Sequence, residues 1–533
     1  MPENIILTGF MATGKTTVGK TLARQLKRAY VDMDAVIEER TGKSIKKIFQ
    51  EEGEDAFRTL ESQLCSELCM QSNLVIATGG GTLVDSANRN MMEKNGTLIC
   101  LTAEVDTIVQ RLGKGYESGR PLLNTSDLRS RIERLMNIRE KSYQSIPWHI
   151  HTTHLSVDQV VDRILSICQA VQINVEYPGG QYPILIGKGF LSHCGDVLLK
   201  AGINANTHTA IVTNPVVEPY YAARVKQSLN GRGINCTICL MPDGEENKTL
   251  HSISSLYDQF LRAGLQRQDT ILALGGGVTG DAAGFAAATY LRGLGFVQIP
   301  TTLLAMVDSS VGGKTGVDLP QGKNLVGAFK QPSLVLIDPG VLRTLPLEEL
   351  RSGMAEVIKH GLIGDPELLN AVESRPGDWE YLRDSRGAEA IIAKAIRVKK
   401  TIVEADPFES DKRALLNFGH TLGHALEMLS GYRIRHGEGV SVGMMAAARI
   451  SAKMNFCTPD LVERLEKILR SWDLPVRIPN YSVDDIVQAM SHDKKKQGTT
   501  LRWILPHDIG DVRIHADIPL DQVINTIFEM GGE

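Results

Sequence analysis

The sequence predicts an α/β protein over its first two thirds and a mainly helical segment after that. Short apolar runs alternate with amphipathic helical patterns up to about residue 335. From about residue 345 the helical periodicity continues without strand patterns. The 533 residues also exceed what one hydrophobic core supports, since domains usually hold about 100–200 residues. We therefore expect three domains.

The first predicted domain spans residues 1–170. Apolar runs at 4–10, 73–81 and 96–102 indicate strands, and the periodic segments 16–26 and 157–171 indicate helices. This alternation is typical of a parallel sheet covered by helices. No low-complexity tract follows it, so the joint near residue 170 is predicted to be tight.

The second predicted domain, residues 171–340, is another α/β unit, and the third, residues 341–533, is mainly helical. A strand, a Pro-Gly turn and a second strand are expected over 173–189. Further strands are expected at 208–213, 236–243, 270–277, 295–300 and 333–338. Helical periodicity then marks 350–363, 390–406, 421–430 and 460–472.

Composition excludes several classes of function. A net charge of −4 argues against a nucleic-acid or membrane surface, because phosphate-backbone binding needs clustered excess cations. We expect a cytoplasmic protein with small-molecule substrates. Eight cysteines are too few for a disulfide framework in a chain of this length. Cys236 and Cys239 form a CxxC, but they lie three apart in a strand-like run, so we interpret them as structural thiols rather than a zinc or redox pair.

A phosphate-binding loop follows the first strand. Residues 9–16, GFMATGKT, fit GxxxxGK[ST] between an apolar run and a helical pattern, which is the context the motif requires. Backbone N–H groups at a helix N-terminus attract phosphate, and the lysine and the hydroxyl serve the terminal phosphates and Mg²⁺. We expect Gly14, Lys15, Thr16 and Thr17 to bind ATP. The loop alone does not identify the acceptor.

The rest of residues 1–168 resembles shikimate kinase. The resemblance rests on YVDMD, EDAFRTLE, the three glycines at 79–81, RPLL at 120–123 and REKSY. It implies that Asp34 orients the hydroxyls of shikimate and that Arg58, Gly80 and Arg139 bind its carboxylate. It also implies that Asp32 joins Thr16 at the Mg²⁺ and that Arg120, in a lid, binds ATP and neutralises the transferring phosphoryl group.

Later segments carry a glycine turn and several histidines. Gly275, Gly276 and Gly277 follow a strand and suit the approach of a pyrophosphate, although the spacing is not GxGxxG. His420, His424 and Glu427 recur at i, i+4 and i+7, so one helix face offers two imidazoles and a carboxylate for a metal. Spacing alone pairs His420 with His424 as ligands.

Residues 173–533 resemble 3-dehydroquinate synthase. The segments that carry this resemblance are PDGEENK, GGGVTGD, IPTTLLAMVDSSVGGKTGVD, GKN, GMAEVIKHG, LNFGHTLGHALE, HGEGV and HDKK. The resemblance implies Glu356, His420 and His436 as ligands of Zn²⁺ or Co²⁺, with His424 beside the substrate. In that reaction NAD⁺ oxidises the phosphorylated keto acid DAHP, phosphate leaves by β-elimination, and re-reduction and ring closure regenerate the cofactor.

The same resemblance implies the remaining site residues. A substrate with a carboxylate and a phosphate needs several cations, and the family positions for DAHP are Arg292, Lys314, Asn324, Lys359, Lys399, Arg413 and His424, with Lys494 or Lys495 as further candidates. Arg292 would reach across a homodimer interface. The positions for NAD are Asp243, Glu245, Lys248, Gly277, Asp281, Thr301, Thr302, Lys314 and Lys323. Catalytic roles fall to Lys15, Asp34 and Arg120 in the first domain and to Asp308, Lys314, Lys359 and His424 in the others.

Two alternatives are open at this point. A metal-dependent polyol dehydrogenase also combines a glycine turn with helical histidines, but it needs no phosphate-binding lysines. The other alternative is that the P-loop domain is a silent regulator, although its catalytic set is complete. If both resemblances hold, the chain supplies two non-consecutive steps of the shikimate route to aromatic amino acids, so no direct channelling is expected.

Overall fold

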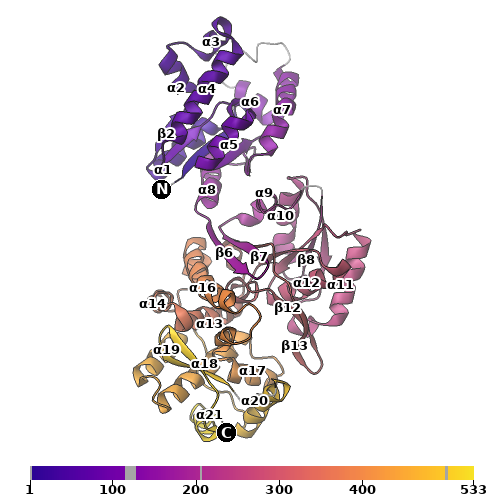
Figure 1. Cartoon of the computed structure of the whole chain (residues 1–533), viewed down its shortest axis with the longest axis vertical. Helices are drawn as coiled ribbons and strands as arrows, with labels where there is room; N and C mark the ends of the chain where they lie inside the picture. Colours follow the sequence, from indigo (N-terminus) through magenta and orange to yellow (C-terminus); the bar gives the residue numbers. More distant parts are fainter. Residues whose placement is uncertain (1–2, 114–127, 205–206, 498–501, 533) are drawn as a thin grey trace. The chain divides into compact units, whose positions relative to one another are not determined.

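The computed structural model describes residues 3–113, 128–204, 207–497 and 502–532, without the side chains of 113 and 491–497. The chain divides into two compact units (Figure 1). Unit 1 comprises Met1–Gln169 and His193–Gly202, and unit 2 comprises Ala170–Ser192 and Ile203–Glu533. Both contain parallel sheets, as predicted. The boundaries of the three expected domains stay predictions.

Unit 1 is built on a five-stranded parallel sheet in the order β2-β3-β1-β4-β5. Its strands are β1 (Asn4–Gly9), β2 (Ala29–Asp32), β3 (Leu74–Ala77), β4 (Gly96–Thr102) and β5 (Trp148–His151). Because these strands are parallel, the loops after β1, β2 and β3 open at one edge of the sheet, where nucleotides bind in such folds.

Helices cover this sheet. They are α1 (Lys15–Leu26), α2 (Met33–Thr41), α3 (Ile45–Glu51), α4 (Gly53–Cys69), the short η1 (Thr82–Val84), α5 (Ser86–Asn95), α6 (Val105–Gly113), α7 (Leu128–Gln144), α8 (Val157–Cys168) and α9 (Cys194–Lys200). Helix α8 begins with a capping box between Ser156 and Gln159, which satisfies two N-terminal backbone donors. Helix α1 begins after Gly14, whose φ of 103° favours glycine.

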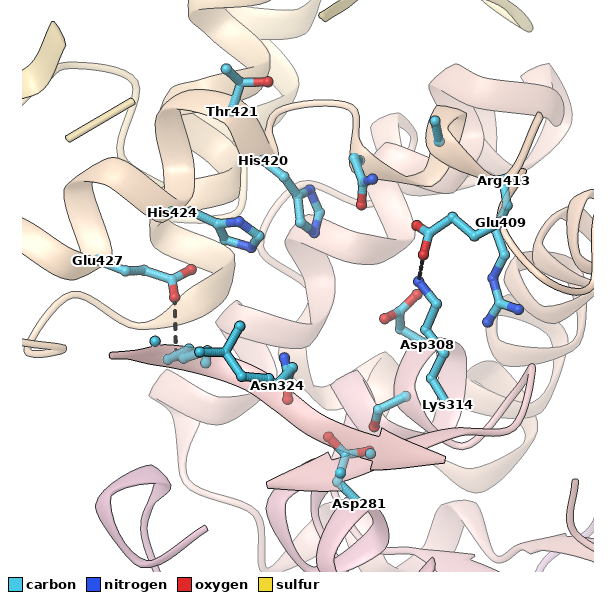
Figure 2. A pocket seen from close by; sticks show the side chains of 18 of the residues that line it. Asp281, Asp308, Lys314, Asn324, Glu409, Arg413, His420, Thr421, His424 and Glu427 are labelled. Atoms are coloured by element: carbon cyan, nitrogen blue, oxygen red, sulfur yellow. Dashed lines mark hydrogen bonds and ion pairs between the residues drawn. The ribbon is translucent and has the colours of Figure 1, made fainter. Parts of the chain in front are cut away.

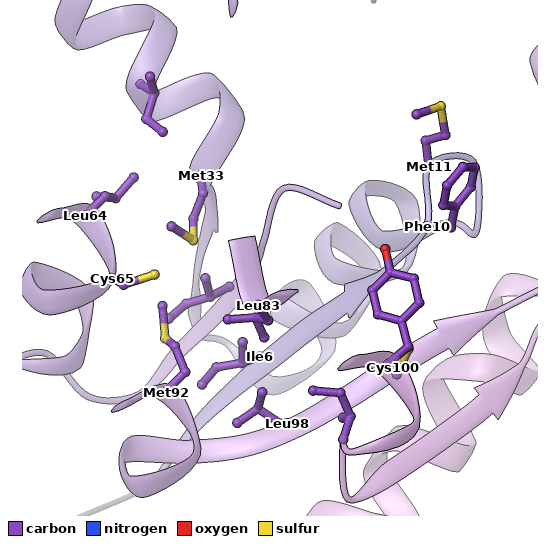
Figure 3. Packing of buried hydrophobic residues seen from close by; sticks show 14 of the residues in the cluster. Ile6, Phe10, Met11, Met33, Leu64, Cys65, Leu83, Met92, Leu98 and Cys100 are labelled. Atoms are coloured by element: carbon purple, nitrogen blue, oxygen red, sulfur yellow. The ribbon is translucent and has the colours of Figure 1, made fainter. Parts of the chain in front are cut away.

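A hydrophobic core lies between the sheet and its helices (Figure 3). Ile6 and Leu98 of the central strands pack with Leu64 of α4 and Met92 of α5, all at most 2% exposed. Burial of such side chains stabilises a fold by about 1.5–3 kcal/mol each. This core holds β1 and β3, the two strands whose ends carry the phosphate loop and the glycine loop.

Unit 2 contains a seven-stranded sheet in the order β6-β7-β14-β11-β10-β8-β9, parallel except for β6. Its strands are β6 (Val171–Tyr177), β7 (Gly180–Ile186), β8 (His208–Thr213), β9 (Asn235–Leu240), β10 (Thr270–Gly275), β11 (Gly295–Pro300) and β14 (Leu334–Ile337). Consecutive strands β8 and β9 run outward on one side of β10, while β11 and β14 lie on the other. This change of direction creates a crevice at the carboxyl ends of β8 and β10.

A separate antiparallel hairpin joins β12 (Lys314–Leu319) to β13 (Gly322–Phe329). The helices of this region are η3 (Phe190–His193), α10 (Glu218–Asn230), η4 (Glu245–Asn247), α11 (Leu250–Arg262), α12 (Gly277–Thr289), η5 (Tyr290–Arg292), the π-helical η6 (Ala305–Ser309) and η7 (Pro339–Arg343). The hairpin packs on α12. Sequence patterns did not predict it.

The last part of unit 2 is mainly helical, as predicted. Its helices are α13 (Leu347–Gly364), α14 (Pro366–Glu373), α15 (Trp379–Arg383), α16 (Ser385–Ala405), η8 (Lys412–Asn417), α17 (His420–Leu429), α18 (His436–Lys453), α19 (Pro459–Ser471), α20 (Val483–Gln497) and α21 (Leu520–Glu529), with a hairpin of β15 (Trp503–Asp508) and β16 (Asp511–His515). The largely buried α18 contacts α13, α17, α19 and α21 (Figure 1). None of the helices among the described residues is both long and apolar enough to cross a membrane.

Candidate functional sites

The phosphate loop of unit 1 runs from β1 into α1. The Lys15 ammonium donates hydrogen bonds to the carbonyl oxygens of Gly9 (2.8 Å) and Phe10 (3.0 Å), which hold it over the loop. The Thr16 hydroxyl donates to Asp32 Oδ2 at 3.1 Å, so the two residues expected at Mg²⁺ are in contact. Gly14 begins the helix, and Thr17 is exposed on its first turn.

The glycine loop after β3 gathers the residues expected to bind shikimate. A Cβ on Gly79 would lie 2.8 Å from Asp34 Oδ1, and one on Gly81 would lie 2.6 Å from Arg58 Nη1. Arg139 Nη1 donates to the Gly80 carbonyl at 3.0 Å, and the Tyr143 hydroxyl donates to the same oxygen at 2.6 Å. Three charged side chains from α2, α4 and α7 therefore meet at one loop. Arg120 lies outside the described residues.

Sequence reasoning did not identify Glu61, which holds Arg58 in place. The Glu61 carboxylate is 1% exposed and accepts hydrogen bonds from Arg58 Nη1 (2.5 Å) and from the Thr82 hydroxyl. Glu54 accepts from Arg58 Nη2 at 2.8 Å. An acidic residue three positions after an arginine on one helix face was the available signal, since such pairs face each other.

Unit 2 contains a cavity of about 1130 Å³ (Figure 2). It is lined by residues of α12, η6, the hairpin, η8 and α17, and several of them were predicted from the sequence: Asp281, Asp308, Lys314, Lys323, Asn324, Lys399, Arg413, His420 and His424. Segments more than 130 residues apart in sequence thus meet around one space. The volume suits a dinucleotide end together with a small substrate.

Glu356, His420 and His436 come together beside this cavity, which His420 lines. The Glu356 Oε1 atom lies 3.9 Å from His420 Nε2 and 3.5 Å from His436 Nε2. One ring nitrogen each of His420, His424 and His436 also lies within 4.8 Å of the others. The pair His420 and His424 that spacing indicated and the set Glu356, His420 and His436 that the resemblance implied therefore both converge, and His420 belongs to each.

Close helix packing sets this geometry. His420 begins α17 and His436 begins α18, and these helices approach through glycines. A Cβ on Gly443 would lie 1.8 Å from the Gly419 carbonyl oxygen, and one on Gly423 would lie 2.9 Å from the Gly439 carbonyl carbon. No larger residue fits between the backbones, so the two imidazoles are brought to the same side.

The donor set fits a divalent cation. The Glu356 carboxylate is fully buried, and neither oxygen accepts a hydrogen bond, although Lys359 Nζ lies 2.5 Å from Oε2. Burial raises the pKa of Glu356, but Lys359 and the two imidazoles outweigh burial and hold that pKa well below its usual range. Burial lowers the pKa of His420, so its ring is neutral. An ionised carboxylate beside a neutral imidazole is a ligand set for zinc or cobalt.

Buried cations lie around the cavity. Lys399 Nζ donates to Asp308 Oδ1 at 2.6 Å, and Lys359 Nζ donates to the Leu416 carbonyl at 2.7 Å. Burial raises the pKa of Asp308, but the Lys399 ammonium outweighs burial and lowers it. Arg413 bonds the Pro407 and Gly312 carbonyls, and Lys314 pairs with Glu409 across the cavity mouth. Such a cluster suits a ligand with more than one negative charge.

The nucleotide positions surround the crevice. Gly277 begins α12, and a Cβ on Gly276 would lie 3.1 Å from Thr302 Cγ2, after β11. The Thr301 amide donates to the Gly275 carbonyl at 2.9 Å. Asp243, after β9, accepts from Asn214 Nδ2 at 2.8 Å, after β8. Asn214 was not predicted, because a lone asparagine after a strand carries no distinctive pattern.

Lys248 is the centre of a buried charge cluster beside this crevice. It is 3% exposed and lies 3.1 Å from Glu245, 3.3 Å from Asp281 and 3.7 Å from Asp318. Burial raises the pKa of Asp281 to about 6, against the lowering effect of Lys248. The Lys248 ammonium also donates to Asn324 Oδ1 at 2.8 Å, which ties the hairpin to the segment between η4 and α11.

Arg292 is not among the residues that line the cavity. It is exposed in the turn Tyr290–Arg292, where Leu291, Arg292 and Gly293 all have positive φ. The side chains of Lys494 and Lys495 are not described. Cys236 and Cys239 are free, and the groups of candidate metal ligands found among the described residues include neither.

Fold and site together define a P-loop kinase unit joined to an α/β enzyme with a dinucleotide-type crevice and a cation site on helices. The shikimate kinase family matches residues 11–169. The N-terminal and C-terminal families of 3-dehydroquinate synthase match residues 238–352 and 353–496.

Individual relatives support these family matches. The 3-dehydroquinate synthase of Synechococcus sp. is 45% identical over 369 residues, which are 67% of this chain and 99% of that protein. The one from Nostoc punctiforme is 43% identical over 353 residues, 66% of this chain and 96% of that protein. The chain belongs to the 3-dehydroquinate synthase family and carries a shikimate kinase domain as well, so it is a bifunctional enzyme of the shikimate pathway.

Solved structures resemble unit 2. ValA, the 2-epi-5-epi-valiolone synthase of Streptomyces hygroscopicus with NAD⁺ and Zn²⁺ bound, is 27% identical with a TM-score of 0.62 and covers 67% of this chain and 98% of its own. A 2-deoxy-scyllo-inosose synthase complexed with carbaglucose-6-phosphate, NAD⁺ and Co²⁺ is 26% identical with a TM-score of 0.61, covering 68% and 100%. Both are synthases of the same fold.

Proposed function

We propose that the cavity of unit 2 converts DAHP to 3-dehydroquinate with NAD⁺ and one Zn²⁺ or Co²⁺ ion held by Glu356, His420 and His436. The observation that carries this proposal is the convergence of a buried, hydrogen-bond-free carboxylate with two imidazoles beside a cavity that His420, lysines and an arginine line. The two synthase structures, one with Zn²⁺ and one with Co²⁺, support it.

The chain's own residues would bind and orient an acidic substrate. Lys314, Lys399 and Arg413 neutralise its phosphate and carboxylate, with Lys359 and Asn324 beside them, and Arg292 completes the site from a second subunit. His424 is placed to move a proton at the cavity wall. When bound, the metal would acidify a substrate hydroxyl and the nicotinamide would accept and return a hydride. Asp243, Glu245, Lys248, Gly277, Asp281, Thr301, Thr302 and Lys323 would hold the dinucleotide.

For unit 1 we propose that Gly14, Lys15, Thr16, Thr17 and Arg120 bind ATP, with Mg²⁺ at Thr16 and Asp32. Asp34 would orient the accepting hydroxyl of shikimate, while Arg58, Gly80 and Arg139 bind its carboxylate. The contacts of Asp34, Arg58 and Arg139 with the glycine loop support this arrangement. Phosphoryl transfer depends mainly on such positioning and on cationic groups near the developing charge.

The test of the synthase assignment is phosphate release. The full chain is incubated with DAHP, NAD⁺ and Zn²⁺ or Co²⁺, with and without a chelator, and inorganic phosphate is measured. We expect release that the chelator abolishes and added metal restores. A metal-dependent polyol dehydrogenase would instead accumulate NADH without releasing phosphate, and that result would overturn the proposal.

A further inference from the structure

Glu427 contacts both a candidate metal ligand and a lysine of the hairpin. It lies on α17, seven residues after His420, and is 3% exposed. One carboxylate oxygen, Oε1, accepts a hydrogen bond from His436 Nδ1 at 2.9 Å. The other, Oε2, accepts from Lys323 Nζ at 3.3 Å. Both oxygens are therefore held, and the side chain has a fixed orientation.

His436 consequently lies between two carboxylates. Its Nδ1 faces Glu427, and its Nε2 lies 3.5 Å from Glu356 Oε1. A histidine whose Nδ1–H donates to a carboxylate keeps its Nε2 lone pair for a metal. Carboxylates placed in this way fix the tautomer and the ring orientation of metal-ligating histidines. Glu427 lies two helical turns beyond His420 on α17, and among the described residues it does not belong to the group of candidate ligands formed by His420, His424 and His436.

We propose that Glu427 is a positioning residue of the cation site, which holds Nδ1 of His436 so that Nε2 is directed to the same point as Glu356 and His420. The proposal rests on the proposed function, since it takes these three residues as the ligands. It assigns to Glu427, the carboxylate on the helix face of His420 and His424, the orientation of His436 and not the coordination of the metal.

The second partner of Glu427 extends its role. Lys323 Nζ lies 3.4 Å from Glu245 and 4.3 Å from the centre of the Tyr432 ring. The chain of contacts His436–Glu427–Lys323–Glu245 therefore connects the cation site with a residue expected to bind the dinucleotide. Glu427 is the member of this series of contacts that touches a candidate metal ligand. Its removal is therefore expected to lower metal affinity even when no cofactor or substrate is present.

The test measures the affinity of the full chain for Co²⁺ by competition with a chromophoric chelator, without NAD⁺ or DAHP. Glu427→Ala is expected to weaken binding about 10- to 100-fold and to change the visible absorption of bound Co²⁺, because His436 loses its orientation. Glu427→Gln keeps an acceptor oxygen but loses the charge, and it is expected to weaken binding about tenfold.

Glu438→Gln is the matched control. Glu438 lies on α18 two residues after His436 and accepts a hydrogen bond from the Arg435 amide at 3.0 Å. Glutamine preserves this capping contact, so the control removes one negative charge near His436 without touching its ring. Its Co²⁺ affinity should equal that of the unmodified chain.

Circular dichroism melting checks that each variant folds, and Glu427→Gln decides the test if Glu427→Ala does not. Wild-type Co²⁺ affinity in a folded Glu427→Gln chain would overturn the proposal, and so would an equal loss in Glu438→Gln. The proposed function fails separately: an unmodified chain that binds Co²⁺ but releases no phosphate from DAHP contradicts that function and leaves the Glu427 result intact.

Discussion

At the residue scale, Glu356 is a buried carboxylate that forms a close ion pair with Lys359. Both side chains are at most 1% exposed, and their charged atoms lie 2.5 Å apart. Neither Glu356 oxygen accepts a hydrogen bond, and a buried ion pair without such bonds is poorly compensated. This imbalance is expected where a site is built to receive a metal ion.

Replacing Glu356 with glutamine should therefore reduce metal affinity strongly. The variant Glu356→Gln loses a charged ligand and leaves the Lys359 ammonium buried without a partner carboxylate. We expect the Co²⁺ affinity to fall by roughly 100-fold or more and the unfolding free energy of unit 2 to fall by about 3–5 kcal/mol. Chelator competition and urea denaturation measure the two effects. An unchanged affinity would exclude Glu356 as a ligand.

Metal uptake should release a proton from His436. Burial lowers the pKa of His436, but the Glu356 and Glu427 carboxylates outweigh burial and raise it to about 10. Below that pH the metal-free ring is protonated on both nitrogens, so a cation must displace one proton. Affinity should therefore rise about tenfold per pH unit between pH 7 and 9. Calorimetry in buffers of different ionisation enthalpy should find about one proton released per ion at pH 7.5, whereas no release would contradict this assignment.

At the scale of elements, the glycine loop of unit 1 is shaped by the side chains around it. Gly81 has a φ of −110°, which any residue can adopt, but a Cβ there would lie 2.6 Å from Arg58 Nη1 and 2.8 Å from Nη2. The substitution Gly81→Ala is thus a purely steric test. Displacing the guanidinium should raise the KM for shikimate roughly 10- to 100-fold. The DAHP-dependent activity of the same preparation is the control and should not change.

The crossing of α17 and α18 should tolerate no side chain at Gly443. Intrinsic propensity favours alanine over glycine in a helix by about 1 kcal/mol. The close approach opposes it, because a Cβ would lie 1.8 Å from the Gly419 carbonyl oxygen. We expect Gly443→Ala to destabilise unit 2 by about 1–3 kcal/mol and to weaken Co²⁺ binding as the two histidines separate.

Gly364→Ala, at the end of α13, is the control for this substitution. The nearest atom to a Cβ there is a Val398 methyl group at 3.2 Å, which can shift slightly. Thermal melting and Co²⁺ titration of both variants distinguish the two positions. If Gly443→Ala were as stable as the unmodified chain, the glycine crossing would not set the distance between His420 and His436.

At the scale of the whole molecule, the α/β classes and most strands follow from local periodicity, because each buried strand is a continuous apolar run. The β12–β13 hairpin does not, since its residues, KTGVDL and GKNLVGAF, mix glycine and charge where packing on α12 decides the structure. Motifs indicated the candidate metal and phosphate residues. Sequence patterns did not indicate Glu61, Asn214 or the contact between Glu427 and His436. These interactions depend on how segments approach in space, and the periodicity and spacing of residues carry no information about that approach.

The division into two units predicts that the two activities can be removed separately. Lys15 and its partners Gly9 and Phe10 belong to unit 1, whereas Glu356, His420 and His436 belong to unit 2. Lys15→Ala should therefore abolish phosphorylation of shikimate by ATP and leave phosphate release from DAHP within about twofold of the unmodified chain, since uncoupled sites behave additively. Glu356→Gln should abolish phosphate release from DAHP and leave phosphorylation of shikimate unchanged. Both rates are measured on the same preparations at saturating substrates. If Lys15→Ala also slowed DAHP turnover, the P-loop unit would regulate the synthase, because only a coupling between the sites could carry the effect of a lysine in one unit to the cavity of the other.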